Sequence, residues 1–206
     1  MPSLALFQWA LAGRLSGEKS PLVLTLADYN PTVLELVTLP NFLLAWALLK
    51  RGKDDVLEDA FSMEGELELT EDVVKAFRHS LTSNQIELSF LSGAWSPDFV
   101  DILYSTSITP LAAENTTTLV MGAETIYSPF ALDSFATTLL SILERERRER
   151  PNGSATAIVA AKKLYFGVGG SLDDFVNKMT GLGARVETVH EENEGVRRGV
   201  VKCLLP

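Results

Sequence analysis

The sequence predicts an α/β fold in which a mostly parallel sheet carries helices on both faces and ends in an antiparallel C-terminal hairpin. Two observations predict it. Short apolar runs typical of buried strands alternate with longer segments that carry apolar residues at helical spacing. Two late apolar runs, at 185–190 and 199–204, follow each other across a polar turn, as in a hairpin. The 206 residues suffice for one domain with a sizeable core, so we expect a single domain over 1–206.

The N-terminal part predicts a helix, a strand and a second, longer helix. Residues 2–12 place apolar side chains on one side at helical spacing. The run at 21–27 predicts a strand, and the turn cluster Asp28-Tyr29-Asn30-Pro31 ends it. A helix then extends from Pro31 to about Leu49, and Pro40 should kink or divide it.

Residues 50–70 differ in character from the chain on either side. They are strongly charged and contain few large apolar residues. We interpret this stretch as a solvated insertion, because a charge run is usually an exposed surface. An arm that contacts a substrate is the alternative.

The rest of the chain continues the alternation of strands and helices. The expected elements are a short helix at about 71–81, a strand at 86–91, one or two helical turns at 98–103, a strand at 118–123, a helix from Pro129 that ends in the charged and exposed segment 144–150, a strand at 155–161, a helix at about 171–181 and the closing hairpin.

Charge and cysteine content exclude several classes of function. The 18 basic and 27 acidic side chains give a net charge of −9, which argues against nucleic-acid binding and is compatible with a basic protein or peptide partner. The single cysteine, Cys203, excludes a disulfide framework and fits a reducing compartment, and we expect it in the core. With only His79 and His190 besides, no clustered metal-ligand pattern exists, so we expect no metal site.

We expect neither a membrane span nor a secretory signal. The longest apolar stretch, Leu34 to Leu49, is interrupted by polar residues and is shorter than the ~20 residues that a span requires. The N-terminus has no basic region before its apolar run.

Three predicted parallel strands end in polar loops, at 28–30, 92–95 and 122–124. The carboxyl ends of parallel strands meet at one edge of a sheet, where α/β folds bind ligands. Asp28 is suited to accept hydrogen bonds from both hydroxyls of a ribose. The alternative is that Asp28 caps the following helix.

The other two loops also allow two interpretations each. The small-residue loop at 92–95 can bring backbone amides to an adenine edge while Trp95 covers its face, or Trp95 is a lid on the core. Glu124, beside a methyl donor, can hold a substrate amine or imidazole or accept its proton. Alternatively, Glu124 caps the next helix and Tyr127 packs beneath it. Gly167 to Gly170 lacks the Gly-Lys-Ser/Thr ending of a phosphate loop, so we do not interpret it as nucleotide-binding.

Five strings together resemble the protein-histidine N-methyltransferases, which belong to the seven-strand, S-adenosylmethionine-dependent class. They are Leu-Ala-Asp-Tyr-Asn-Pro (26–31), Val-Thr-Leu-Pro-Asn (37–41), Ser-Gly-Ala-Trp (92–95), Glu-Thr-Ile-Tyr (124–127) and Lys-Lys-Leu-Tyr-Phe-Gly-Val-Gly-Gly (162–170). The resemblance covers essentially the whole chain from Pro2. The second and fifth strings are specific to this branch, whereas the acid-x-x-Tyr motif also fits lysine-modifying relatives.

The resemblance implies a Rossmann-like sheet that binds S-adenosylmethionine, and methyl transfer to a histidine of a large-subunit ribosomal protein in the cytoplasm or nucleus. It implies catalytic roles for Glu124 and Tyr127. The residues that it places around the cofactor are Asp28, Tyr29, Asn30, Gly93, Ala94, Trp95 and Ala123. From the charge and the lack of a long apolar stretch we expect no direct contact with nucleic acid or membrane, and the sequence does not show the oligomeric state.

The chain departs from the family pattern at its start. Such enzymes begin with a strand and a glycine-rich loop just before the helix in which Met1-Pro2-Ser3-Leu4-Ala5 would lie. We therefore expect a form truncated at the N-terminus, without the central first strand and its loop. The loss would leave two unsatisfied edges in the sheet, closed by re-pairing or by a partner chain. We expect weak or no cofactor binding by this chain alone.

Two alternatives to a histidine methyltransferase stay open. One is a non-catalytic remnant, a binding protein that kept the fold and lost the cofactor loop. The other is lysine methylation by the same fold.

Overall fold

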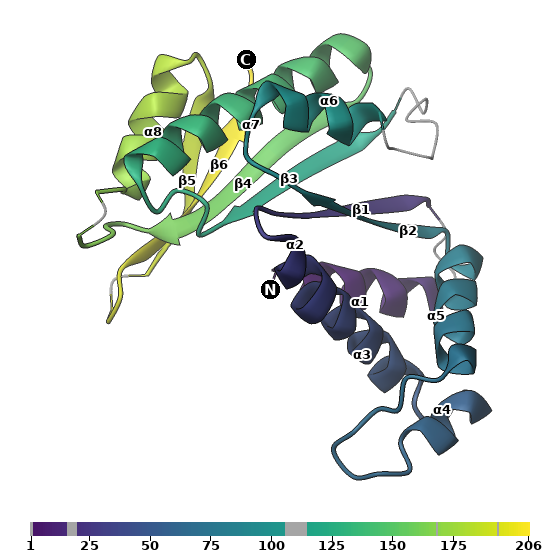
Figure 1. Ribbon diagram of the computed structural model, residues 1–206. Helices are drawn as coiled ribbons and strands as arrows, with labels where there is room; N and C mark the ends of the chain where they lie inside the picture. The colour runs from purple at the N-terminus through teal and green to yellow at the C-terminus, as the bar shows by residue number, and fades with distance from the viewer. Residues whose placement is uncertain (1, 16–19, 106–114, 168, 193) are drawn as a thin grey trace. The chain divides into compact units, whose positions relative to one another are not determined.

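The structure is a computed structural model, and it describes residues 2–15, 20–105, 115–167, 169–192 and 194–206 (Figure 1). The chain divides into two compact units, Met1–Gly93 and Ala94–Pro206, and each has its own hydrophobic core. The predicted α/β class is confirmed, because both units combine parallel strands with helices and the chain ends in an antiparallel hairpin. The single domain expected over 1–206 stays a prediction.

The first unit contains a two-stranded parallel sheet and a set of helices. Its elements are α1 (Pro2–Leu15), β1 (Leu22–Asp28), α2 (Pro31–Val33), the π-helical turn η1 (Leu34–Thr38), α3 (Leu39–Lys50), α4 (Asp55–Ala60), α5 (Glu71–Ser83) and β2 (Ile86–Ser92). β1 and β2 pair in register from Leu22 opposite Ile86 to Asp28 opposite Ser92. The core of the unit is aromatic where the helices meet, since Phe42 packs on Phe7, and Trp46 on Phe77.

The long helix after β1 is continuous, and Pro40 changes its winding rather than dividing it. The turn η1 precedes Pro40, and the backbone N–H of Leu39 donates to the carbonyl of Leu34, five residues earlier. Proline has no N–H to donate, so the wider π turn accommodates the missing bond. The amide of Asn41 donates to the carbonyl of Val37 at 2.7 Å, which satisfies an acceptor at this irregularity.

The same helix is longer than the apolar stretch Leu34 to Leu49 that was judged too short for a membrane span. Pro31–Lys50 has 20 residues and a mean hydropathy of 1.7, so its length and composition would allow it to cross a membrane. Of its most apolar 18-residue window 39% is buried, and the buried side chains, among them Phe42 and Trp46, belong to the core of the first unit. The absence of a membrane partner stays a prediction.

The charged segment 50–70 is not solvated throughout. It contains α4, which Asp54 caps by accepting a hydrogen bond from the backbone N–H of Val56 at 3.2 Å. Leu57 and Ala60 of this helix are buried in the core of the first unit. The prediction missed this helix because four acidic residues surround its two core positions.

The second unit contains a four-stranded mixed sheet with helices on one face (Figure 1). Its elements are α6 (Pro97–Ser105), β3 (Thr117–Ala123), α7 (Pro129–Glu149), β4 (Ser154–Lys162), α8 (Leu172–Gly181), β5 (Arg185–Glu192) and β6 (Arg198–Leu204). The strand order is β3-β4-β6-β5, with β3 and β4 parallel and the other two pairs antiparallel. Alternate residues of β4, namely Ala157, Val159 and Ala161, are buried in the core. Cys203 of β6 is also buried there, which confirms its predicted place.

The predicted single sheet occurs as two sheets. Within the described residues β1 pairs with β2 alone and β3 pairs with β4 alone. β1 and β3 therefore each form the edge of a sheet. Both carry candidate site residues at their carboxyl ends.

The predicted exposed end of α7 is partly buried, and this prediction was wrong for two residues. Glu146 and Arg150 are buried and form an ion pair of 2.7 Å. Tyr104 of α6 and Thr118 of β3 also donate to the Glu146 carboxylate, at 2.6 Å and 2.8 Å. A charge can be buried when its hydrogen bonds are satisfied, and here the network connects α6, α7 and β3.

Candidate active site

Glu124 lies directly after β3, in a backbone conformation that few side chains adopt. Its φ is +57°, in the left-handed region. Its N–H donates to the carbonyl of Ala160 at 2.9 Å, so the residue is still attached to β4 as the chain turns away from the sheet. Strained conformations of non-glycine residues cluster at functional sites, and this one projects a carboxylate at the carboxyl end of a parallel strand.

Two hydrogen-bond donors fix the Glu124 carboxylate. The hydroxyl of Tyr165 donates to Oε2 at 2.7 Å, and the guanidinium Nε of Arg198 donates to Oε1 at 3.3 Å. The Glu124 side chain remains 44% exposed, so a ligand can reach it. Each carboxylate oxygen accepts more than one hydrogen bond, and capacity for a further donor remains.

Tyr165 is neutral in this arrangement. Burial and the hydrogen bond to Glu124 raise the pKa of its phenol to about 12. The hydroxyl therefore keeps its proton at neutral pH and donates it to the carboxylate. The residue is buried, and its hydroxyl also accepts a hydrogen bond from the N–H of Lys162 at 3.3 Å.

The glycine-rich loop after β4 positions Tyr165. The N–H of Tyr165 donates to the carbonyl of Gly170 at 2.9 Å, which closes the loop. A Cβ at Gly170 would lie 2.3 Å from the carbonyl oxygen of Ile126, so only glycine allows the loop to approach the segment after Glu124 this closely. Val168 of the predicted string lies outside the described residues.

The interpretation of Glu124 as a helix cap was wrong. The cap of α7 is Ser128, whose hydroxyl accepts a hydrogen bond from the N–H of Ala131 at 3.2 Å. Tyr127 does not pack beneath the helix, because it is 54% exposed, while its neighbour Ile126 is fully buried. Both Glu124 and Tyr127 thus present side chains to solvent at this edge of the second unit.

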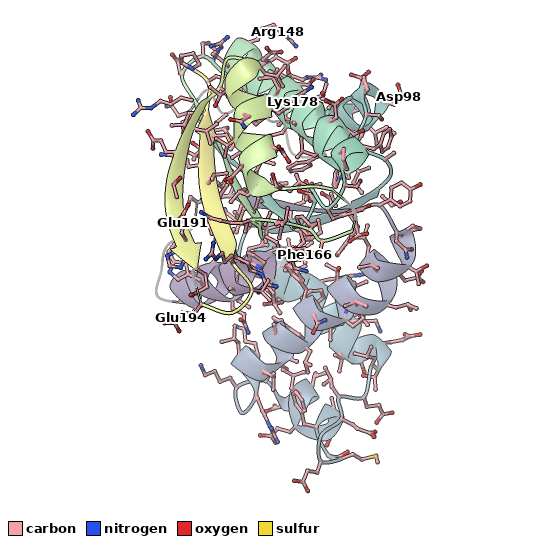
Figure 2. All side chains as sticks on the ribbon, turned by 90° about the vertical axis from the view of Figure 1, so that its left-hand side faces the viewer. Asp98, Arg148, Phe166, Lys178, Glu191 and Glu194 are labelled. Carbon is pink, nitrogen blue, oxygen red and sulfur yellow. The ribbon has the colours of Figure 1, made fainter. Side chains whose placement is uncertain are left out.

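Exposed aromatic residues lie on the two segments that pack together here. Phe130 at the start of α7 is 82% exposed. Phe166, in the loop that carries Tyr165, is 90% exposed and is labelled in Figure 2. Together with Tyr127, they supply apolar and aromatic surface on the segments that flank the carboxylate. From the sequence, Tyr165 and Phe166 were noted only as members of the family-specific string 162–170, and no role was predicted for either residue.

Asp28 is the last residue of β1. It does not cap the following helix, so the alternative interpretation of Asp28 as a helix cap was wrong. Asn30 caps the helix instead, since its side chain accepts a hydrogen bond from the N–H of Thr32 at 2.9 Å. Oδ1 of Asp28 accepts a hydrogen bond from the N–H of Asn30 at 2.8 Å, which forms a tight turn. Within the described part of the chain no hydrogen bond occupies Oδ2. The neighbouring Tyr29 is 72% exposed.

The backbone of the two strand ends joins Asp28 to Gly93. The N–H of Gly93 donates to the carbonyl of Asp28 at 3.3 Å, and Gly93 has a φ of +155°. A small cavity of about 280 Å3 adjoins this end of the sheet. It is lined by Pro31, Leu34, Glu35, Leu39, Phe90 and Ser92.

Trp95 packs as a lid on the core of the second unit, which was the alternative interpretation. Its ring lies edge-on to Phe99 at 5.0 Å and to Phe135 at 5.5 Å between centroids. The same Phe135 packs against the end of β3, where a Cβ at Gly122 would lie 2.7 Å from its ring. Trp95 and the strand that carries Ala123 and Glu124 therefore share one packing centre.

The predicted site residues form two groups in different units. Asp28, Tyr29, Asn30 and Gly93 belong to the first unit, whereas Ala94, Trp95, Ala123, Glu124 and Tyr127 belong to the second. The first group offers a carboxylate oxygen, Oδ2 of Asp28, which suits a ribose hydroxyl. The second offers a fixed carboxylate among exposed aromatic rings. Among the described residues no three metal-ligating side chains gather into a group that could hold a metal ion.

The chain is similar to curated proteins named histidine protein methyltransferase 1. It is 31% identical to the Saccharomyces cerevisiae protein over 214 aligned positions, which cover 98% of this chain and 53% of that protein. It is 31% identical to the Schizosaccharomyces pombe protein, over 88% of this chain and 46% of that protein. The Bos taurus homologue is 28% identical over 86% of this chain and 40% of its own length. The chain thus spans about half the length of the curated relatives it matches, or less.

Other comparisons add little. No protein-family model matches the chain. A solved structure described as "delta-N METTL16 MTase domain" aligns with 99% of the chain at 11% identity and a TM-score of 0.38, too low to support an argument. The similarity to the yeast proteins extends over nearly the whole chain, and it confirms the resemblance of this chain to the histidine protein methyltransferases.

Proposed function

We propose that this chain methylates a histidine side chain of a protein, with S-adenosylmethionine as the methyl donor. The observation that carries the proposal is the Glu124 carboxylate, held in a left-handed backbone conformation by Tyr165 and Arg198 at the end of β3. The curated relatives that match the chain are named as histidine methyltransferases, which supports this chemistry over other uses of the site. A histidine of a large-subunit ribosomal protein as target, and action in the cytoplasm or nucleus, are part of the proposal and rest on the resemblance alone.

Glu124 acts on the substrate by orienting it. The N–H of a neutral imidazole donates to the carboxylate, which fixes the ring and leaves the lone pair of the other nitrogen free to attack. Because a neutral imidazole is already nucleophilic, correct positioning supplies most of the acceleration. Tyr165 and Arg198 prevent the carboxylate from rotating away, and the neutral phenol of Tyr165 does not compete for a proton at physiological pH.

The methyl donor supplies a sulfonium methyl group, an electrophilic carbon that needs no metal or redox partner. Asp28 would hold its ribose through Oδ2, while the N–H of Asn30 binds Oδ1 and the N–H of Gly93 binds the backbone carbonyl of Asp28. Tyr29, which is 72% exposed, would lie beside the adenine. The residues present fit the nucleoside part of this cofactor, because they combine an acid at a strand end with small residues and aromatic rings.

The test is mass spectrometry of ribosomal proteins from cells that lack the gene and from cells to which it has been restored. The proposal expects a methylated histidine that disappears in the first and returns in the second. An unchanged histidine methylation pattern would remove the proposal. Loss of a methylated lysine with all histidines unchanged would instead support the lysine-modifying alternative.

A further inference from the structure

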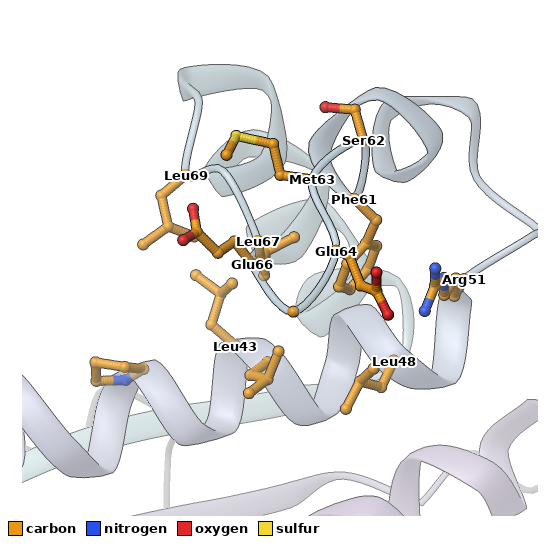
Figure 3. Close-up of a pocket in the computed structure, with 13 residues that line it drawn as sticks. Leu43, Leu48, Arg51, Phe61, Ser62, Met63, Glu64, Glu66, Leu67 and Leu69 are labelled. Carbon is orange, nitrogen blue, oxygen red and sulfur yellow. The ribbon is translucent and has the colours of Figure 1, made fainter.

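A groove in the first unit is lined by none of the predicted site residues. It is formed between α3 and the loop that follows α4, and its volume is about 840 Å3 (Figure 3). This volume is in the range of ligand-binding clefts. The lining consists of four residues of α3, of Arg51 just after it, and of residues 61–67 and Leu69 from the loop; the four are Pro40, Leu43, Leu44 and Leu48.

The lining is apolar and yet open to solvent. Leu44 and Leu48 are one turn apart on α3 and are 39% and 52% exposed. On the loop side Met63 is 65% exposed and Leu69 57% exposed. Single exposed apolar residues are common, but four that face one groove are typical of an interaction surface.

Acidic side chains surround this apolar lining. Glu64 and Glu66 are part of the groove itself, and Figure 3 shows both beside the apolar side chains. The segment 50–72 contains nine acidic and three basic residues, which accounts for six of the nine negative charges in the net charge of the chain. In the described part of the chain no ion pair neutralises Glu64, Glu66 or Glu68, whereas Lys75 pairs with Glu71 and Asp72.

We propose that this groove binds a basic, apolar helical segment of a partner protein. Apolar side chains of the partner would occupy the space between Leu48 and Met63, and its lysine or arginine residues would pair with Glu64 and Glu66. The groove follows α3 over the 12 positions from Pro40 to Arg51, about 17 Å, which matches roughly three turns of an amphipathic helix.

The acidic charge of this segment argues against two other occupants, an anionic membrane and a second copy of this chain. An anionic membrane would be repelled by the acidic rim. A second copy of this chain would bring another net charge of −9 against a segment that is already acidic. The inference does not depend on methyl transfer, since it concerns binding at a separate surface.

Fluorescence anisotropy with a labelled synthetic peptide tests the proposal on the whole chain. The probe is a helical peptide with leucine at every third or fourth position and lysine on its other face. We expect a Kd below about 100 μM at physiological salt. A matched peptide with glutamate in place of lysine, and one with serine in place of leucine, should each bind at least about tenfold more weakly.

Paired protein variants locate the binding surface. Glu64→Lys with Glu66→Lys should weaken binding about tenfold, and Leu48→Ser with Met63→Ser by at least as much. The control variant, Glu144→Lys with Asp173→Lys, makes the same charge change at exposed residues of the second unit and should leave the Kd unchanged. All of these side chains are exposed, and circular dichroism confirms that each variant is folded.

Several outcomes would overturn the proposal. A Kd above about 100 μM would do so, as would equal losses in the groove and control variants. Binding to phosphatidylcholine–phosphatidylserine vesicles that the Leu48→Ser and Met63→Ser variant abolishes would show that the surface contacts lipid instead. A dimer in sedimentation that the same variant dissociates would show that the occupant is a second copy.

Discussion

The Glu124 carboxylate depends on residues that lie far from it in the sequence. Its two donors, Tyr165 and Arg198, are 41 and 74 positions further along the chain. They come from the loop after β4 and from the first residue of β6, so the site forms only when the whole sheet of the second unit is assembled. The strained backbone at Glu124 is tolerated because these contacts oppose its relaxation.

Replacement of Tyr165 by Phe should destabilise the chain by about 1–2 kcal/mol, because a buried hydroxyl bonded to a carboxylate is lost. Urea unfolding followed by circular dichroism measures the change. Tyr127→Phe is the matched control, since Tyr127 is 54% exposed, and it should change the free energy of unfolding by less than about 0.5 kcal/mol. Equal effects of the two substitutions would contradict the assigned hydrogen bond.

A comparison of the wild type with Tyr165→Phe also tests the raised pKa of the Tyr165 phenol. The phenol of Tyr165 has a pKa of about 12 in the folded chain, raised from the ordinary 10.0 by burial and by Glu124. The stability that the neutral phenol contributes is complete below pH 10 and is lost as the pH rises toward 12, because the unfolded chain releases the proton first. The difference in unfolding free energy between the wild type and Tyr165→Phe should therefore shrink over this window. A constant difference would contradict the shift.

At the residue scale the sequence identified the acids but not their surroundings. Asp28 and Glu124 were predictable, because each follows an apolar run at the end of a parallel strand. Neither acid caps the helix that follows it. Asn30, two residues after Asp28, and Ser128, four residues after Glu124, are the caps, because each directly precedes its helix. Tyr165 was not predictable, since only the folded sheet brings it to Glu124. The one signal was its place in the family-specific string.

At the scale of elements, the C-terminal end of α7 is attached to its neighbours by a buried charge network. Glu146 accepts hydrogen bonds from Tyr104, Thr118 and Arg150, and Arg150 also donates to Thr118 at 3.3 Å. Burial and the bond to Glu146 raise the pKa of the Tyr104 phenol far above its ordinary value. Helix α7 is thereby fixed to α6 and to the amino end of β3, at the end opposite Glu124.

Glu146→Gln should destabilise the chain by about 3–5 kcal/mol, because it leaves the buried Arg150 guanidinium without its counter-charge. Glu149→Gln, three residues further on, removes a carboxylate that is 44% exposed and bonded to Arg145 at 2.9 Å. That control should cost less than about 1 kcal/mol. Both are measured by urea unfolding, and a cost for Glu146→Gln as small as that of the control would show that the network does not fix the helix.

Gly170→Ala should destabilise the second unit by about 1–3 kcal/mol, because the new Cβ would lie 2.3 Å from the carbonyl oxygen of Ile126. Gly181→Ala is the control. A Cβ at Gly181 would meet no described atom within 4 Å outside its own helix, and alanine there should change stability by less than about 1 kcal/mol, in the stabilising direction. Thermal unfolding compares the two, and a neutral Gly170→Ala would contradict the close contact of the two loops.

The order and type of most elements were predictable from periodicity, and the misses have physical causes. Pro40 has no N–H, and the helix accommodated it by a π turn without being divided. Helix α4 was hidden because two core residues sit among acidic ones. The end of α7 looked exposed because charge alone does not reveal that Tyr104 and Thr118 would satisfy a buried carboxylate.

At the scale of the whole molecule, the candidate site residues are divided between the two compact units. Asp28 and Gly93 lie in the first, and Glu124 and Tyr165 in the second. In the described chain β1 and β3 are sheet edges without a strand paired on their free sides. The α/β class and the closing hairpin were predictable from the sequence. The division into two sheets was not predicted as such. The family resemblance predicted only that the sheet would have two unsatisfied edges where the first strand is missing.

We predict that this chain alone binds S-adenosylmethionine with a Kd above about 100 μM, because the candidate residues lie in two compact units whose described strands form separate sheets. Isothermal titration calorimetry measures it. Binding in the micromolar range would contradict the prediction and would show that the two groups are already arranged for the cofactor.

The central claim is that Glu124 orients a substrate histidine for methylation. The most direct test introduces Glu124→Gln into the chromosomal gene and measures histidine methylation of ribosomal proteins by mass spectrometry, with Glu149→Gln as the control, since both carboxylates are 44% exposed and paired with an arginine. The amide keeps the shape of the side chain but loses the charge that holds the imidazole. We expect methylation to fall about 100-fold or more in Glu124→Gln and to stay at the wild-type level in the control. Wild-type methylation in a normally expressed Glu124→Gln protein would contradict the claim.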